Sequence, residues 1–263
     1  MKKLLSILII GVLLVIVAGC DNAMENQNTS NMSQRADSTK IPESEDTAPT
    51  ANDTYEVGDI IYFGKYEQDN NTSNGDEKIA WRILEKEDGK IFVLSEQLLG
   101  NAQNYHNEDV SKITWETCSL RSWLNNTFIN KAFSPEEQKK IIPTTAKTAD
   151  HSCRDCLYGY TDGGNDTVDK VFLLSRDEVK TYFPIQEERI ITEPAFYLTI
   201  DLSNTSGDKM WVRTTDWWLR SPGCTGYLVD RVEDNGFIRA ESVYENHNGV
   251  RPAMWIEWDK NKK

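Results

Sequence analysis

The folded part of the chain begins with short apolar runs that predict β-strands. Residues 59–66 and 79–85 are rich in Ile, Tyr, Phe and Trp. The dipeptide Asp88-Gly89 separates the second run from another apolar run at 90–95. A two-residue Asp-Gly loop between apolar runs is typical of a β-hairpin. We therefore expect antiparallel strands at this end of the domain.

The middle of the chain changes to a helical period. Within 115–131 the large apolar residues recur at spacings of three and four, which predicts one buried helix face: Leu120, Trp123, Leu124 and Phe128. Ser134 and Glu137 have the spacing of a capping box, with Pro at the first turn, and so predict a second helix start. Ser175 and Glu178 repeat that spacing.

Strand-like runs return in the C-terminal third. Asn235-Gly236 separates two of them and predicts a second hairpin, and a short buried strand is expected earlier, at 171–174. The C-terminal runs are 217–220, 228–233, 237–243 and 250–258. Strands at both ends with helices between them predict an α+β fold in which the first and last strands meet in one sheet.

The N-terminal segment has the pattern of an exported precursor. Lys2 and Lys3 precede an apolar run at 4–17, which is shorter than the ~20 residues of a membrane-spanning helix. The following Val-Ala-Gly-Cys resembles a bacterial lipobox, and this resemblance implies diacylglycerol on Cys20 and cleavage before it. We predict a signal peptide at 1–19 and a lipid anchor on the extracytoplasmic face of the cell membrane.

Composition divides the rest of the chain into a stalk and a domain. Residues 21–54 contain no aromatic residue and are dominated by Asn, Ser, Thr, Asp and Glu, so we predict a disordered stalk after the lipidated cysteine, at 20–54. One folded domain is expected at 55–263. The formal net charge of −13 becomes −15 once Lys2 and Lys3 are removed, which argues against nucleic acid as a partner.

Several stretches of the domain resemble a bacterial domain-of-unknown-function family that is common in surface lipoproteins. They include Trp217-Trp218-Leu219-Arg220-Ser221-Pro222, Gly249-Val250-Arg251-Pro252, and Ser119-Leu120-Arg121-Ser122-Trp123. The Trp-Leu-Arg-Ser and Gly-Val-Arg-Pro stretches are also similar to those of C-type-lectin-like domains, including the formylglycine-generating branch. This resemblance implies a mixed lectin-like fold with two or three helices, long loops and a binding face.

The resemblance does not carry over the functional motifs of either branch. Calcium-dependent lectins use a Glu-Pro-Asn or Gln-Pro-Asp triplet, whereas this chain has Glu193-Pro194-Ala195. Formylglycine-generating enzymes bind copper through a cysteine pair, and no pair here aligns with that motif. We therefore expect no catalytic residues, although an oxidase of this type or a metal-dependent enzyme is kept as an alternative.

Four cysteines follow Cys20 and are candidates for disulfide bonds: Cys118, Cys153, Cys156 and Cys224. An even number in an exported protein favours disulfides, and the sequence does not separate the three pairings. A redox pair or half of a zinc site at Cys153 and Cys156 is the alternative.

A Gly-rich loop carries closely spaced oxygen ligands at Asp162, Asn165, Asp166 and Asp169. Calcium requires hard oxygen ligands of this kind, so the loop is a candidate calcium site. The spacing is not that of an EF-hand, and we favour a solvated turn without a cofactor.

Aromatic and arginine side chains are the candidate ligand contacts of the domain. Rings stack on sugar faces, which makes several residues candidates: Trp211, Trp217, Trp218, Tyr227 and Tyr244. Neighbouring Trp217 and Trp218 point to opposite faces of a strand, so one is exposed unless both faces are covered. Arg220 and Arg251 are candidates too, but we favour pairing of both with buried carboxylates.

These observations favour a non-enzymatic, lipid-anchored surface domain of lectin-like fold that binds a glycan or an extracellular protein. The alternatives are the enzyme named above and a structural envelope protein with no ligand of its own. A solute-binding lipoprotein of a transporter is disfavoured, because its two lobes need alternating strands and helices.

Overall fold

A computed structural model describes residues 55–68, 72–99, 103–108, 112–152, 160–191, 198–201, 209–212 and 215–258. The predicted signal peptide, Cys20 and the stalk lie outside the described residues, and so do Cys153, Cys156 and the 193–195 triplet. No helix in the described ranges is long and apolar enough to cross a bilayer.

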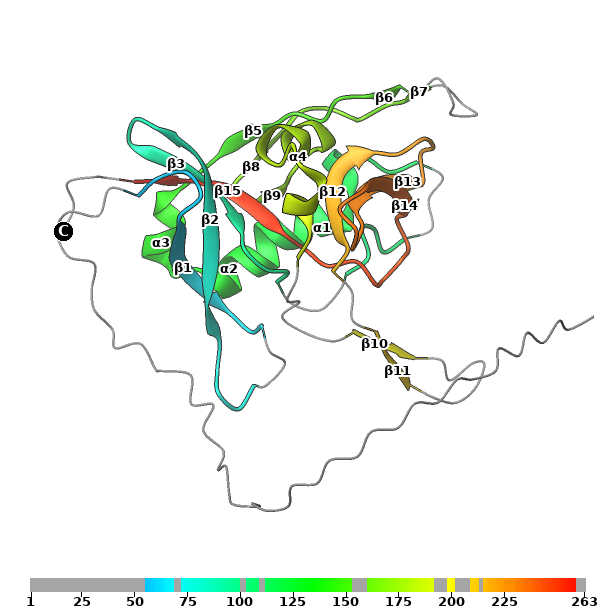
Figure 1. Ribbon diagram of the computed structural model, residues 1–263. Helices are drawn as coiled ribbons and strands as arrows, with labels where there is room; N and C mark the ends of the chain where they lie inside the picture. The colour runs from blue at the N-terminus through cyan, green and yellow to red at the C-terminus, as the bar shows by residue number, and fades with distance from the viewer. Residues whose placement is uncertain are drawn as a thin grey trace, which may run out of the picture. The chain divides into compact units, whose positions relative to one another are not determined.

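The main sheet joins the two ends of the domain (Figure 1). Its antiparallel strands lie in the order β1 (Ile60–Tyr66), β2 (Glu77–Glu87), β3 (Lys90–Ser95), β15 (Pro252–Glu257) and β4 (Ile141–Ile142), and β9 (Phe172–Leu173) also pairs with β15. The predicted meeting of the first and last strands is confirmed. Asp88-Gly89 forms the predicted hairpin, with Glu87 opposite Lys90 and Gly89 at a φ of 74°.

The sheet is bent by irregularities in its pairing. The register shifts between Tyr62 and Lys65 in β1 and between Ile83 and Glu85 in β2. Such bulges increase the local twist of a strand, and helix α2 packs on β1.

The predicted helix at 115–131 begins later than its apolar period suggests. A helical turn, η1 (Trp115–Thr117), is followed by Cys118 in an extended conformation. Helical residues then continue through α1 (Ser119–Trp123), the π-helical η2 (Leu124–Phe128) and α2 (Ile129–Ala132). The break arises because the Cys118 Sγ caps α1, accepting a hydrogen bond from the Arg121 N–H.

Both predicted capping boxes are confirmed. Ser134 caps α3 (Pro135–Lys140) and Ser175 caps α4 (Arg176–Tyr182). Each serine hydroxyl accepts from the backbone N–H of the glutamate three residues on, and each glutamate accepts from the serine N–H. These signals are local, so the sequence alone located them.

A second antiparallel sheet contains β12 (Trp217–Pro222), β13 (Leu228–Val232) and β14 (Ile238–Ser242). The predicted Asn235-Gly236 turn lies between β13 and β14. The remaining elements are η3 (Gln186–Arg189) and the pairs β5 (Thr144–Ala146) with β8 (Thr167–Asp169), β6 (His151–Ser152) with β7 (Tyr160–Thr161), and β10 (Leu198–Asp201) with β11 (Lys209–Val212). The fold is therefore mixed α+β, as predicted, and the structure shows that most of its regular elements are strands.

Candidate functional site

The two tryptophans proposed as stacking surfaces are part of the core. Trp217 and Trp218 are both 0% exposed, and every residue of β12 is buried. The Trp217 Nε1 donates to the Arg189 carbonyl and the Trp218 Nε1 to the Gln103 carbonyl, at 3.3 and 2.7 Å. Both faces of this strand are covered, so neither ring is available to a ligand.

Arg220 is a structural residue with all of its donors used. Both Nη atoms contact the two carboxylate oxygens of Glu178, and the Nε and Nη2 donate to the Lys147 carbonyl at 3.1 and 3.0 Å. The Nη1 also donates to the Leu173 carbonyl at 2.6 Å. These bonds account for all five N–H groups of a guanidinium. The favoured pairing with a carboxylate is confirmed for Arg220.

Arg251 is equally buried but lacks such a partner. Its Nε donates to the Ser95 carbonyl at 2.8 Å and its Nη2 to the Glu96 carbonyl at 3.5 Å. Among the described residues, no group bonds to its Nη1 and no carboxylate forms an ion pair with it. The expected ion pair with a buried carboxylate is wrong for Arg251, because its donors meet main-chain carbonyls, its guanidinium lies over aromatic rings, and Glu96 acts on it only through its charge.

Two of the three remaining aromatic candidates, Tyr244 and Trp211, carry less information. Tyr244 is half-buried and packs against the core. Trp211 belongs to β11, and its side chain lies outside what the structure describes.

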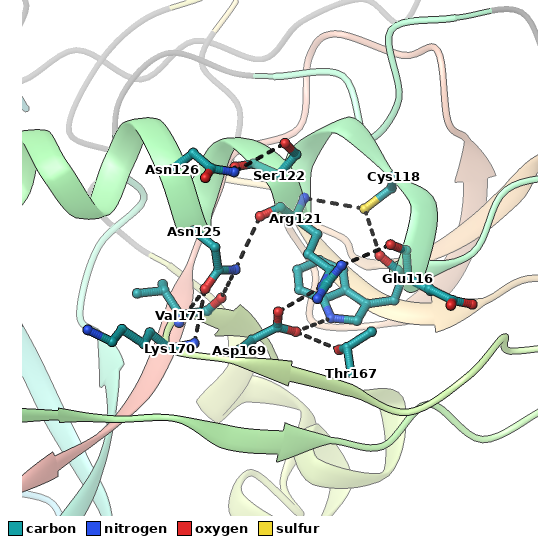
Figure 2. A network of polar contacts seen from close by, with 11 residues as sticks. Glu116, Cys118, Arg121, Ser122, Asn125, Asn126, Thr167, Asp169, Lys170 and Val171 are labelled. Atoms are coloured by element: carbon teal, nitrogen blue, oxygen red, sulfur yellow. Dashed lines mark hydrogen bonds and ion pairs between the residues drawn. The ribbon is translucent and has the colours of Figure 1, made fainter.

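Asp169, one of the candidate calcium ligands, is the centre of a closed polar network (Figure 2). One carboxylate oxygen accepts from the Arg121 Nε at 2.7 Å, and the other accepts from the Trp115 Nε1 and the Thr167 hydroxyl at 2.9 and 2.6 Å. Asn125 extends the network by accepting from the backbone at 170 and 171. The network ties η1 and α1 to β8, so Asp169 has a structural role.

The other candidate calcium ligands, Asp162, Asn165 and Asp166, do not gather around one point. Asp162 forms an ion pair with Lys112 at 2.9 Å and accepts from the Gly164 N–H at 2.9 Å. Asn165 donates to Glu116, and Asp166 is exposed. Within the described ranges, no three His, Cys, Asp or Glu side chains form a group that could hold a metal ion. The hydrogen bond and charge of Lys112 lower the pKa of Asp162.

Two of the four cysteines proposed for disulfides are free thiols. Cys118 is buried and Cys224 is half-buried. The Cys118 thiol forms two hydrogen bonds at the start of α1. It donates to the Trp115 carbonyl and accepts from the Arg121 N–H, both at 3.4 Å. Burial raises the pKa of this thiol to about 12, so it remains a neutral cap. The structure thus forms no bridge at these two positions.

A surface cavity of about 550 Å³ brings together residues that are distant in sequence. We call it the Tyr cavity, and its lining includes Lys112, Tyr160, Asp162, Thr225, Gly226 and Tyr227. The Ile113 N–H donates to the Gly226 carbonyl at 2.7 Å and holds the β12–β13 connection against the segment before η1. β7 supplies Tyr160 (Figure 1).

The Tyr cavity combines exposed rings with polar groups. Tyr160 is 59% exposed and Tyr227 is 47% exposed. The Tyr160 hydroxyl donates to Asp150 at 2.8 Å, which raises the pKa of the phenol and orients the ring. The Thr225 hydroxyl oxygen is buried and has no hydrogen-bond partner among the described residues. A smaller cavity of about 340 Å³ shares Lys112 and Asp162 and extends this surface.

A family model described as "Domain of unknown function (DUF6273)" matches residues 88–258, more than half of the chain. The chain belongs to this family. The DUF6273 region begins at the Asp88-Gly89 hairpin and ends at the last residue after β15 that the structure describes. No curated protein and no solved structure matches the chain.

The DUF6273 region contains the whole Tyr cavity and Arg251. The strands β1 and β2 precede it, although they form one edge of the same sheet. Residues of β2, such as Arg82, therefore lie outside the matched region.

Sequence reasoning named Tyr227 as a stacking candidate but missed Tyr160 and Thr225. Tyr160 stands beside the Gly-rich loop at 162–164, and an aromatic residue in such a loop is the signal that could have found it. Thr225 has no distinguishing pattern, because only the fold shows that its hydroxyl oxygen is buried without a partner.

Proposed function

We propose that this member of the DUF6273 family is a surface lipoprotein, anchored through lipid on Cys20, whose domain binds glycans at the Tyr cavity without catalysis. The Lys-rich start, the apolar run and the Val-Ala-Gly-Cys end support the anchor. The Trp-Leu-Arg-Ser and Gly-Val-Arg-Pro stretches, similar to those of C-type-lectin-like domains, support a lectin-like domain.

The observation that carries the proposal is the pair of exposed tyrosines beside a hydroxyl without a partner. Sugar rings present an apolar face that packs on aromatic rings, and their hydroxyls need polar partners at the edges. Tyr160 and Tyr227 supply the rings, Lys112 and Asp162 supply a donor and an acceptor at the surface, and the buried Thr225 hydroxyl belongs to the same lining. The neighbouring smaller cavity gives room for a second sugar unit.

Full-length protein in a detergent that carries no sugar can be tested on a glycan array, followed by calorimetry with the best glycan. Tyr160→Ala and Tyr227→Ala should each weaken that binding about tenfold or more, because each removes a stacking ring. Tyr62→Ala is the matched control, since Tyr62 is 67% exposed on β1 and does not line the cavity. Absence of any glycan binding, or equal loss in the control, would exclude glycan binding at this cavity.

The anchor has a separate test. Cells grown with an alkyne fatty acid should label the wild-type protein and not Cys20→Ala. Label retained in the variant would show that the lipid is elsewhere.

A protein ligand is the other outcome for the domain. It would be indicated by a purified partner protein whose binding is lost in the tyrosine variants, together with a glycan array on which nothing binds.

A further inference from the structure

A second cavity, of about 580 Å³, lies on the side of the domain formed by β2, α4 and η3. We call it the Arg251 cavity, and the lining residues used below are Arg82, Glu96, Phe183, Glu188, Ile191 and Arg251. It shares no lining residue with the Tyr cavity.

Arg251 is the unusual residue of this cavity. It is 4% exposed, and its guanidinium carbon lies 5.1 Å from the Trp217 ring centroid and 5.6 Å from that of Phe183. These rings hold the guanidinium by cation–π contact and leave the Nη1 atom without a hydrogen-bond partner among the described residues. Burial lowers the pKa of Arg251 to about 10, the charge of Glu96 opposes this shift in part, and Arg82 adds a smaller lowering.

A buried guanidinium with an unpartnered donor and no ion pair raises the free energy of the folded state. Charged side chains are rarely fully buried unless they are paired, and buried polar atoms almost always find a hydrogen-bond partner. Glu96, the nearest candidate, already binds the Nε and Nη2 of Arg82. An anion from outside the chain would satisfy the open Nη1 donor and compensate the charge.

The carboxylates and apolar residues of the lining indicate which class of anion fits the cavity. Arg82 is neutralised by Glu96, and Glu188 adds a second, exposed carboxylate at the cavity. A dianion such as a phosphate monoester would be repelled by these acids, whereas a single negative charge matches the single unpaired cation. Apolar residues also line the cavity, among them Leu84, Ile190 and Ile191. An apolar body next to the charged group therefore fits the walls.

We infer that the Arg251 cavity binds a monocarboxylate whose carboxyl group is attached to an apolar body, with Arg251 as the anchor for the carboxylate. Arginine suits this role because its planar fork matches the geometry of a carboxylate. The inference is independent of glycan binding at the Tyr cavity.

Three probes of one shape test the inference on the wild-type protein. Full-length protein in detergent is titrated by calorimetry and thermal shift with 3-phenylpropionate, its neutral amide and phenyl phosphate. We expect the carboxylate to bind and raise the melting temperature, and the amide and the phosphate monoester to bind at least tenfold more weakly. Equal binding of acid and amide, or no binding of the acid, would overturn the inference.

Variants then locate the binding. Arg251→Met should reduce carboxylate affinity at least tenfold, and Arg251→Lys should retain part of it. Arg239→Met is the matched control, because Arg239 is an exposed arginine of β14 outside the cavity. The Tyr160→Ala, Tyr227→Ala double variant should bind the acid normally. Unchanged affinity in Arg251→Met would place the carboxylate elsewhere and overturn the assignment.

Discussion

Arg220 and Arg251 are two buried arginines in the same domain with opposite surroundings. Arg220 directs its five N–H groups to Glu178 and two carbonyls, and it is 3% exposed. Arg251 is 4% exposed, bonds to two carbonyls only, and leaves its Nη1 open beside a cavity. A buried charge with a complete shell stabilises a fold, whereas one with an incomplete shell beside a cavity is suited to bind a ligand.

Neither residue type nor burial separates the two roles. Both arginines are followed closely by proline. The difference lies in the partner supplied by another element. α4 places Glu178 in direct contact with Arg220, whereas the Glu96 carboxylate near Arg251 binds Arg82 instead, and no described carboxylate forms an ion pair with Arg251. The following predictions use substitutions at both places to test this difference.

The largest effect is expected from Arg220→Met. It leaves the Glu178 carboxylate and the Leu173 and Lys147 carbonyls without their donors, and breaking a buried ion pair costs about 3 to 5 kcal/mol. Urea unfolding measures the free energy of unfolding, with Arg239→Met as the control for removal of an exposed arginine. A loss below about 1 kcal/mol would place Arg220 in the same class as Arg251.

Asp169→Asn should also destabilise the protein, by about 2 kcal/mol, because it is a second buried charge with a complete shell. An amide keeps only one acceptor oxygen, whereas the carboxylate accepts from three side chains. Asp166→Asn, at an exposed position in the same loop, is the control. Equal unfolding free energies for the two variants would contradict the structural role of the network.

Arg251→Met should change the unfolding free energy by no more than about 1 kcal/mol, and the change can be stabilising. Replacing an uncompensated buried charge with an apolar side chain of similar length removes a desolvation cost and strands no carboxylate. Urea unfolding of the wild type and of Arg251→Met measures this change in the free energy of unfolding. A loss as large as that of Arg220→Met would show that a structural partner of Arg251 exists.

The pH dependence of the unfolding free energy is a further test of the difference between Arg251 and Arg220. Its folded pKa of about 10 is below the ordinary arginine value, so the unfolded state binds more protons above pH 10. The charged Arg251 therefore destabilises the folded state in full at pH values well below 10. This destabilisation decreases as the pH rises and the side chain loses its proton. Relative to Arg251→Met, the wild type should gain about 1 kcal/mol between pH 8.5 and pH 10.5. Parallel pH profiles of the two proteins would contradict the lowered pKa.

The sequence predicted best what depends on neighbours along the chain. The Asp88-Gly89 hairpin and the capping boxes at Ser134 and Ser175 need only a few adjacent residues to be recognised. The helix start at 115 was wrong by a few residues, because Cys118 caps α1 with its thiol, which is not among the usual capping groups.

The candidate sites depended on contacts across long sequence separations. Apolar periodicity indicated that Trp217 and Trp218 lie on a strand, but only the packing of other segments on both faces of β12 decided that neither is exposed. Likewise, the spacing of acids made the loop at 162–169 a candidate calcium site beside the favoured solvated turn, and only the fold shows that Asp169 is buried and bonded to Arg121 and Trp115.

By itself, the sequence determined the α+β class, the meeting of the first and last strands in one sheet, the helix caps and the resemblance to a domain-of-unknown-function family, because period, turn chemistry and short motifs are local properties. Only the tertiary structure decided which polar groups are satisfied. Lys112, Tyr160 and Thr225 form one cavity because three separate segments meet there. Arg220 and Arg251 differ because satisfying a buried charge depends on a partner brought from elsewhere in the chain.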